Sequence, residues 1–210
     1  FAGFDRDYST YVYDHEGNHL WTYKAPPVTE MLEGRAGFEP PAVIWDIDGD
    51  GNGEVIHWRY IDGEQWLVVV DGATGEIKNK TLFPCTEPHA FNNYRIAVAK
   101  LKPGYPDDLI VYADCGGTIF INAYDKALNL LWSHVEKRKK DNLGHYIYPR
   151  DINGDGIDEV IVGALALDSH GKVLWDRLEK INHDHIDSMR FIDIENDGAE
   201  EIIAAYSNLG

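Results

Sequence analysis

The chain has 210 residues, 44% of them hydrophobic and 26% charged, which is the composition of a folded globular protein and not of a disordered or fibrous one. Its 19 basic and 36 acidic residues give a formal net charge of −17, and a surface this negative repels phosphate backbones, so we expect no nucleic-acid partner. No stretch approaches the ~18 consecutive apolar residues of a membrane span. The chain begins at Phe1 without a leader sequence, so we expect a mature or excised piece.

One pattern recurs along the chain: a strand, a short polar loop and a second strand. Its copies end at Ile56, Ile110, Ile161 and Ile203, a spacing typical of the blades of a β-propeller. The first, third and fourth copies have an acidic loop, and these are called below the first, second and third acidic loops. The loop of the second copy has lost the acids, and the corresponding positions are Lys100, Lys102 and Gly104.

A second pattern, strand, turn and strand, follows each of the first three copies, over 65–77, 118–132 and 164–175. β-Branched and aromatic residues flank a Gly, Asn or Asp turn there, as a hairpin requires. The stretch 9–21 has the same pattern with no first half before it. One copy of each pattern together supplies the four strands of a propeller blade.

We therefore expect an all-β chain, folded as one β-propeller domain or segment over 1–210. Its expected parts are a half-blade 1–25, blades 43–82, 95–135 and 148–178, and a half-blade 189–207. Either the two half-blades pair and close a small four-bladed ring, or the chain belongs to a ring of six to eight blades. Ends that fall inside repeats favour the larger ring, because natural terminal repeats are usually atypical caps.

The three acidic loops share a spacing in which positions 1, 3, 5 and 9 carry oxygen-bearing side chains and position 6 is a glycine. Alternating hard oxygen ligands around a tight loop suit Ca²⁺, whereas an EF-hand needs its bidentate Glu at position 12 between two helices. The predicted Ca²⁺ ligands are Asp46, Asp48, Asp50 and Glu54 in the first loop, Asp151, Asn153, Asp155 and Glu159 in the second, and Asp193, Glu195, Asp197 and Glu201 in the third. The alternative is a set of acid-capped turns without metal.

The motifs from about 93 to 205 resemble, in their order, the calcium-rich β-propeller polysaccharide lyases. The resemblance is greatest to the rhamnogalacturonan lyases, and ulvan and rhamnose-glucuronate lyases are related. It rests on Gly144-His145 ahead of Asp151-Ile-Asn-Gly-Asp-Gly and on Asp184-His185-Ile-Asp187 ahead of Asp193. The sequence departs from the family where Asp184 and Ile186 replace two glycines and where Arg190 replaces a further His. Integrin-like FG-GAP repeats use the same calcium loop without catalysis.

Elimination at a uronate needs a cation that neutralises the carboxylate, a base for the C5 proton and an acid for the leaving oxygen. The long connections between blades should converge on the face opposite the acidic loops. There the resemblance implies His145 and His185 as base and acid, with Tyr146 and His183 as further candidates. The candidates for contact with substrate carboxylates are Arg95, Arg150, Lys137, Arg138, Lys139, Lys140 and Arg190.

The sequence thus predicts a secreted or extracellular monomer, with the periplasm and the cell surface as other locations. We expect structural Ca²⁺ and β-elimination of an acidic, uronate-containing, rhamnose-rich polysaccharide. The alternative is a non-catalytic, integrin-like propeller that binds glycan or protein, and the two differ in whether His145, His185 and the basic loop share a pocket. Cys85 and Cys115 form one disulfide or none, so they do not fix the compartment.

Overall fold

A computed structural model of the chain describes residues 2–4, 9–26, 42–85, 93–115, 117–137, 143–144, 146–177 and 186–206. Within these ranges the chain consists of strands, turns and loops, without a helix. The prediction of an all-β chain is therefore confirmed for the part that the structure describes. This part also contains no helix long and apolar enough to cross a membrane.

The strands form five antiparallel sheets in which neighbours in sequence are neighbours in space. The first sheet has β1 (Ala2–Phe4), β2 (Thr10–Tyr13) and β3 (His19–Tyr23), and the second has β4 (Ala42–Trp45), β5 (Glu54–Ile61), β6 (Glu64–Asp71) and β7 (Ile77–Leu82). The third has β8 (Asn93–Ala99), β9 (Asp108–Asp114), β10 (Thr118–Tyr124) and β11 (Leu130–Lys137). The fourth has β12 (Ile147–Arg150), β13 (Glu159–Val162), β14 (Leu165–Leu167) and β15 (Val173–Asp176), and the fifth has β16 (Ile186–Ile192) and β17 (Glu201–Tyr206).

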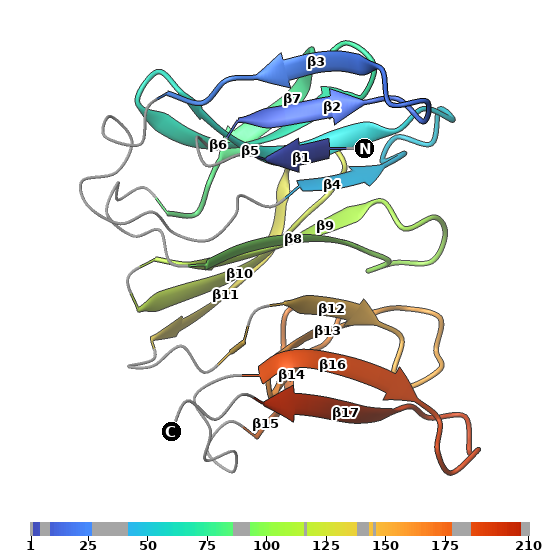
Figure 1. Cartoon of the computed structure of the whole chain (residues 1–210). Coiled ribbons are helices and arrows are strands. Elements are labelled where there is room, and N and C mark those ends of the chain that lie inside the picture. Colours follow the sequence, from blue (N-terminus) through green and yellow to red (C-terminus); the bar gives the residue numbers. More distant parts are fainter. Residues whose placement is uncertain are drawn as a thin grey trace.

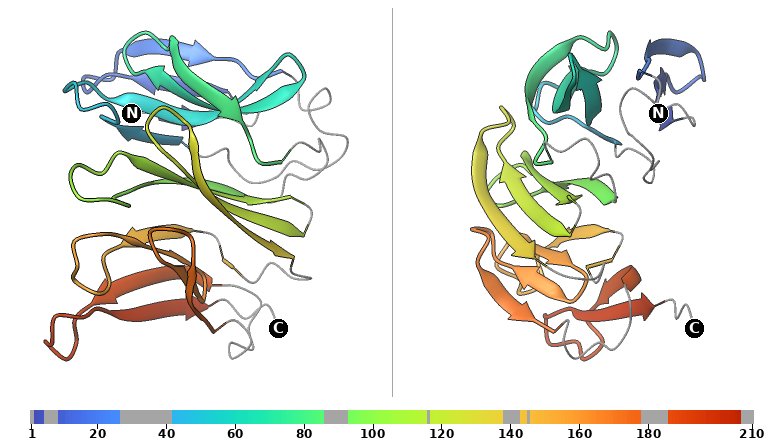
Figure 2. Two further views of the ribbon diagram at one scale, coloured as in Figure 1. Left: turned by 180° about the vertical axis from the view of Figure 1, so that it is seen from behind. Right: turned by 90° about the vertical axis from the view of Figure 1, so that its left-hand side faces the viewer.

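The sheets follow one another along an open arc (Figure 2). Their first strands lie next to each other, because β4 contacts β8 and β8 contacts β12. This is the arrangement expected around the axis of a propeller, although the described strands do not close into a ring. The four-stranded units of the prediction are thus confirmed, and the number of blades in a complete ring stays a prediction.

The first sheet contains a strand that the sequence pattern did not indicate. β1 pairs with β2, with Ala2 opposite Val12 and Phe4 opposite Thr10. The segment Ala-Gly-Phe is too short to show an alternating pattern, and its glycine lowers the strand propensity. The strand, turn and strand expected over 1–25 therefore has a third strand at its edge.

The hydrophobic core lies between neighbouring sheets. One cluster joins the first two sheets, a second joins the second and third, and a third joins the third, fourth and fifth. The central strands β9 and β13 are buried along their whole length, and apart from acidic residues at their ends they are apolar runs in the sequence. Apolar side chains of each sheet are therefore buried against a neighbouring sheet.

Two indoles bridge adjacent sheets in the same way. Trp21 Nε1 donates to the carbonyl of Gly72 at 3.0 Å, and Trp132 Nε1 donates to the carbonyl of Ser169 at 2.8 Å. A disulfide between Cys85 and Cys115, with the two Cα atoms 5.5 Å apart, joins the second sheet to the third. The sequence left this bond open because spacing alone does not reveal the geometry that a disulfide needs.

Candidate functional site

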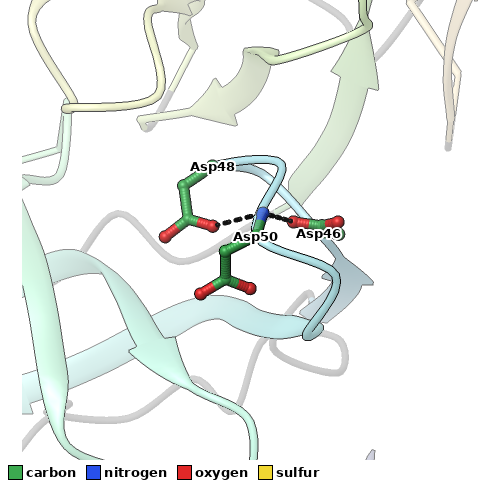
Figure 3. Close-up of side chains that lie close together, drawn as sticks. All are labelled: Asp46, Asp48 and Asp50. Atoms are coloured by element: carbon green, nitrogen blue, oxygen red, sulfur yellow. Dashed lines mark hydrogen bonds between the residues drawn. The ribbon is translucent and has the colours of Figure 1, made fainter.

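The acidic loops lie together at one edge of the sheets, on the right in Figure 1, where β4 turns into β5, β12 into β13 and β16 into β17. In the first loop, one carboxylate oxygen from each of Asp46, Asp48 and Asp50 lies within 4.8 Å of the others (Figure 3). The backbone N–H of Asp50 donates to Asp46 at 3.0 Å and to Asp48 at 3.2 Å. The loop is thus folded so that three carboxylates converge, and this donor set fits a hard cation such as Ca²⁺.

Glu54, at position 9 of the first loop, is fully buried. Its Oε2 accepts a hydrogen bond from the backbone N–H of Ile47 at 3.0 Å, and its Oε1 accepts one from Lys78 Nζ at 2.7 Å. Lys78 Nζ also lies 2.9 Å from Asp48 Oδ2. The hydrogen bonds to Glu54 and Asp48 raise the pKa of Lys78, and the bond from Lys78 lowers the pKa of Asp48.

The second loop has the same backbone design without a lysine. Asp151 accepts hydrogen bonds from the N–H groups of Asp155 at 3.1 Å and Gly156 at 2.8 Å. The nearly buried Glu159 accepts one from the N–H of Ile152 at 3.1 Å and one from the Asn153 side-chain amide at 2.9 Å. Burial raises the pKa of the Glu159 carboxyl, and the negative charges of Asp155 and Asp151 add to the effect.

The third loop repeats the design in a more exposed setting. Asp193 accepts hydrogen bonds from the N–H groups of Asp197 at 3.1 Å and Gly198 at 2.9 Å, and Glu201 accepts one from the N–H of Ile194 at 2.7 Å. In all three loops, the acid at position 1 accepts hydrogen bonds from the backbone N–H groups of positions 5 and 6. The acid at position 9 accepts one from the backbone N–H of position 2. Within the described residues, only the first loop gathers three acidic side chains within metal-binding distance.

At the opposite edge, the structure brings together two of the predicted substrate-binding and catalytic residues. The guanidinium carbon of Arg95, on β8, lies 5.3 Å from the centroid of the Tyr146 ring, just before β12. Tyr146 is half exposed, and its ring centroid lies 6.3 Å from that of Tyr148. A cation and an exposed phenol are thus adjacent near the start of β12, as a site for an acidic sugar needs.

The other catalytic candidates, His145, His183 and His185, lie outside the described residues, as do Arg138, Lys139 and Lys140. The residues that flank two of these histidines are nevertheless described. Gly144 has φ +81°, and a Cβ built on it would lie 2.4 Å from the carbonyl oxygen of Ile186. The residue before His145 and the residue after His185 are therefore in close backbone contact, which only a glycine permits.

The other basic candidates that the structure describes are Arg150, Lys137 and Arg190. Arg150 ends β12 at the acidic edge, where its guanidinium donates to Glu200 through Nε at 2.6 Å and Nη2 at 2.5 Å, and these bonds raise its pKa. Lys137 is the last residue of β11, and Arg190 lies within β16 with Nη1 donating to the carbonyl of Met189 at 2.7 Å. The position of Arg150 follows from the sequence, since it directly precedes Asp151, the first residue of the second acidic loop.

Comparison with known proteins identifies the fold. The sequence is 23% identical over 176 residues to the rhamnogalacturonan endolyase YesW of Bacillus subtilis (strain 168), covering 63% of this chain and 28% of that protein. The crystal structure of the exotype rhamnogalacturonan lyase YesX superposes with a TM-score of 0.75 at 20% identity, covering 94% of this chain and 39% of that one. The structure of rhamnogalacturonan lyase YesW gives the same TM-score and identity, with 95% and 40% covered.

The chain has the β-rich fold of these lyases. It spans less than half the length of each of these lyases. No protein-family model matches the sequence.

One residue at the acidic edge was not predicted from the motif, and this is Lys78. It lies in β7, far from the first loop in sequence, so the loop spacing does not include it. The sequence nevertheless contains a signal for it. In each hairpin the residue three positions after the left-handed turn residue can be compared: it is Leu20, Leu131 or Leu174 in three of them and Lys78 in the fourth.

Proposed function

We propose that this chain is part of a polysaccharide lyase that cleaves an acidic, uronate-containing and rhamnose-rich polysaccharide by β-elimination. The observation that carries the proposal is the match to rhamnogalacturonan lyase structures over nearly the whole chain, with a TM-score of 0.75. The order of the Gly-His and His-x-Asp motifs ahead of the second and third loops agrees with it.

The reaction takes the C5 proton of the uronate and expels the oxygen at C4. In this proposal His145 and His185 serve as base and acid, with Tyr146 and His183 as further proton-transfer candidates. The close contact of Gly144 with Ile186 supports a shared site for the two histidines that are bonded to these residues. Arg95 beside Tyr146 supplies a positive charge that can neutralise the substrate carboxylate. The run Lys137, Arg138, Lys139 and Lys140 would attract the polymer over a longer range.

We further propose that the acidic loops bind Ca²⁺ as a structural ion. When bound, Ca²⁺ neutralises the crowded carboxylates and ties the start of the second strand of a sheet to its loop. The convergence of Asp46, Asp48 and Asp50 in the first loop supports this, and so does the burial of the Glu159 carboxyl group in the second. The disulfide supports an extracellular location, because disulfides persist in oxidising compartments.

The test of the lyase proposal is the ultraviolet absorbance of the unsaturated uronate product. The chain is incubated with rhamnogalacturonan, ulvan and polygalacturonate, and with a neutral glycan as control. His145→Ala and His185→Ala should each lower turnover by ~10² or more, the usual scale for a general acid or base, without lowering the melting temperature. Binding of an acidic glycan without product would contradict the lyase and favour the non-catalytic alternative.

A further inference from the structure

The last strands of four hairpins contain a β-bulge at the same place. In each case one residue of the strand has no partner in the neighbouring strand. These bulge residues are Leu20, Lys78, Leu131 and Leu174. Three of these residues are the partly exposed leucines Leu20, Leu131 and Leu174. The fourth is Lys78, so one sheet has a cation where the others have an aliphatic side chain.

The bulge in β7 brings the Lys78 ammonium group to the first acidic loop. Its Nζ lies 2.7 Å from Glu54 Oε1, 2.9 Å from Asp48 Oδ2 and 3.9 Å from Asp50 Oδ2. These are side chains at positions 9, 3 and 5 of the predicted metal site. Ca²⁺ takes such oxygens at about 2.3 to 2.6 Å, so an ion in this loop would lie beside the same carboxylates as the ammonium group, and the two positive charges would repel each other.

In the third sheet, too, a lysine of the chain pairs with the buried acid at position 9 of the loop. There Asp108 begins β9 as Glu54 begins β5, and it is buried in the same way. Lys102, at position 3 of that metal-less loop, donates to Asp108 Oδ1 at 2.6 Å. A buried carboxylate at position 9 is thus neutralised by a lysine of the chain itself in two of the sheets.

Among the described residues, the second loop has no lysine bonded to its position-9 acid, and the adjacent Arg150 is paired with Glu200 instead. Glu159 is 4% exposed, and its Oε1 is met by the neutral amide of Asn153 at 2.9 Å. Leu174 occupies the bulge, and no basic side chain of the described residues forms an ion pair with Asp151, Asp155 or Glu159. A buried carboxylate without a compensating charge is unfavourable, so this loop gains most from an added cation.

We propose that Lys78 is the built-in cation of the first loop: it holds that loop folded without metal, competes with Ca²⁺, and leaves the second loop as the tighter calcium site. This inference rests on the proposed calcium binding of the loops and assigns the loops different affinities. The first loop, whose four predicted ligands are all acids, is then the weaker site. The second loop, in which Asn153 replaces one acid, is then the tighter site.

The test uses Lys78→Leu, which installs the residue of the other three bulges, with Lys80→Leu as the matched control. Lys80 lies on the same strand, but its Nζ packs on the Trp66 ring at 4.1 Å. In chelator, K78L should melt below both the wild type and K80L. Isothermal titration with CaCl₂ alone should show that K78L gains a site at least ~10-fold tighter than the wild-type first loop, since ligand and charge changes tune these loops over decades of Kd.

The reciprocal variant, Leu174→Lys, should weaken the second site by at least ~10-fold. Leu174 is half exposed, so a lysine stem can be accommodated there. Asp48→Ala in the K78L background should remove the gained site, and Asp155→Ala in the wild type should remove the second. Lys78→Gln provides a polar variant without the charge should K78L fold poorly.

The outcomes separate the two proposals. Calcium binding that Asp155→Ala removes, combined with identical titrations for K78L, K78Q and the wild type, would overturn the role of Lys78 and leave the calcium sites intact. No calcium binding by the wild type, K78L or K78Q would overturn both.

Discussion

Two junctions between sheets are built alike, and the junction between them is built differently. Where the first sheet meets the second, and the third meets the fourth, an indole from the last strand stacks on a glycine in the next sheet's turn. A Cβ at Gly75 would lie 2.7 Å from Trp21, and one at Gly171 would lie 2.6 Å from Trp132. These glycines are required both for their left-handed φ and for the close approach of the ring.

At the junction of the second and third sheets, the tryptophan position of β7 is Asn79, and the turn residue that corresponds to the glycines is Leu128 at φ +63°. Without an indole above it, a side chain is tolerated there. This junction instead contains the disulfide Cys85–Cys115 and a hydrogen bond from Trp45 Nε1 to the carbonyl of Pro106 at 2.9 Å. Two of these junctions thus contain a tryptophan stacked on a glycine, and the junction between them contains a disulfide.

Reduction should therefore act on the middle junction. We expect the double variant Cys85→Ser, Cys115→Ser to lose about 3 to 4 kcal/mol of unfolding free energy, because a disulfide that closes a loop of this length restricts the unfolded chain. Urea unfolding with and without reductant measures this loss. The double variant should be insensitive to reductant, and an unchanged midpoint for the reduced wild type would contradict the assignment.

The packed junctions should depend on their indoles. Trp132→Ala should cost about 3 kcal/mol, since it removes a large, partly buried ring and its hydrogen bond to Ser169. Asn79→Ala is the matched control, because it truncates the corresponding residue at the junction without an indole, and it should cost less than ~1 kcal/mol. Equal losses in thermal unfolding would show that the two kinds of junction do not differ.

The junction of the first two sheets should also respond to pH through His57. This side chain is fully buried, its Nδ1 lies 3.2 Å from Thr10 Oγ1, and its Nε2 accepts from Arg59 Nε at 3.0 Å. Burial, with the Arg59 charge adding to it, lowers the pKa of His57 from 6.5 to about 3. The unfolded chain therefore binds the proton first as the pH falls below 6.5, and stability present above that pH is lost on acidification.

The slope is at most ~1.4 kcal/mol per pH unit for one proton, so about 2 kcal/mol should be lost by pH 5. Unfolding curves of wild type and His57→Gln between pH 7 and pH 5 test this, and the variant should show a smaller decline. His170→Gln changes an exposed histidine and should leave the wild-type slope unaltered.

The smallest effect is expected at a polar contact of the third and fourth sheets. Asp158 Oδ2 accepts from the N–H of Lys100 at 2.7 Å, and the N–H of Asp158 donates to the Lys100 carbonyl at 2.8 Å. Asp158→Asn should cost about 1 kcal/mol in chemical unfolding, because an amide oxygen is a weaker acceptor than a carboxylate. A loss as large as that of Trp132→Ala would mean that this polar pair dominates the junction.

The sequence predicted what repeats within it. Four-stranded units and acidic loops recur several times, so each copy supports the others, whereas features present once lack that mutual support. The pairing of Cys85 with Cys115, the strand β1 and the contact of Lys78 with Glu54 depend on how sheets and bulges place distant residues. The catalytic assignment of His145 and His185 came from the resemblance and stays a prediction.

The disulfide also has a mechanical consequence. In a chain pulled from its two ends, tension would pass from Cys85 directly to Cys115, so the intervening segment, which includes β8 and β9, would carry no load. The sequence separation of 30 residues corresponds to about 100 Å of extended chain that stays hidden until the bond is reduced. Single-molecule stretching should therefore record a contour length that grows by about this amount in reductant, while the unlinked sheets extend in either condition.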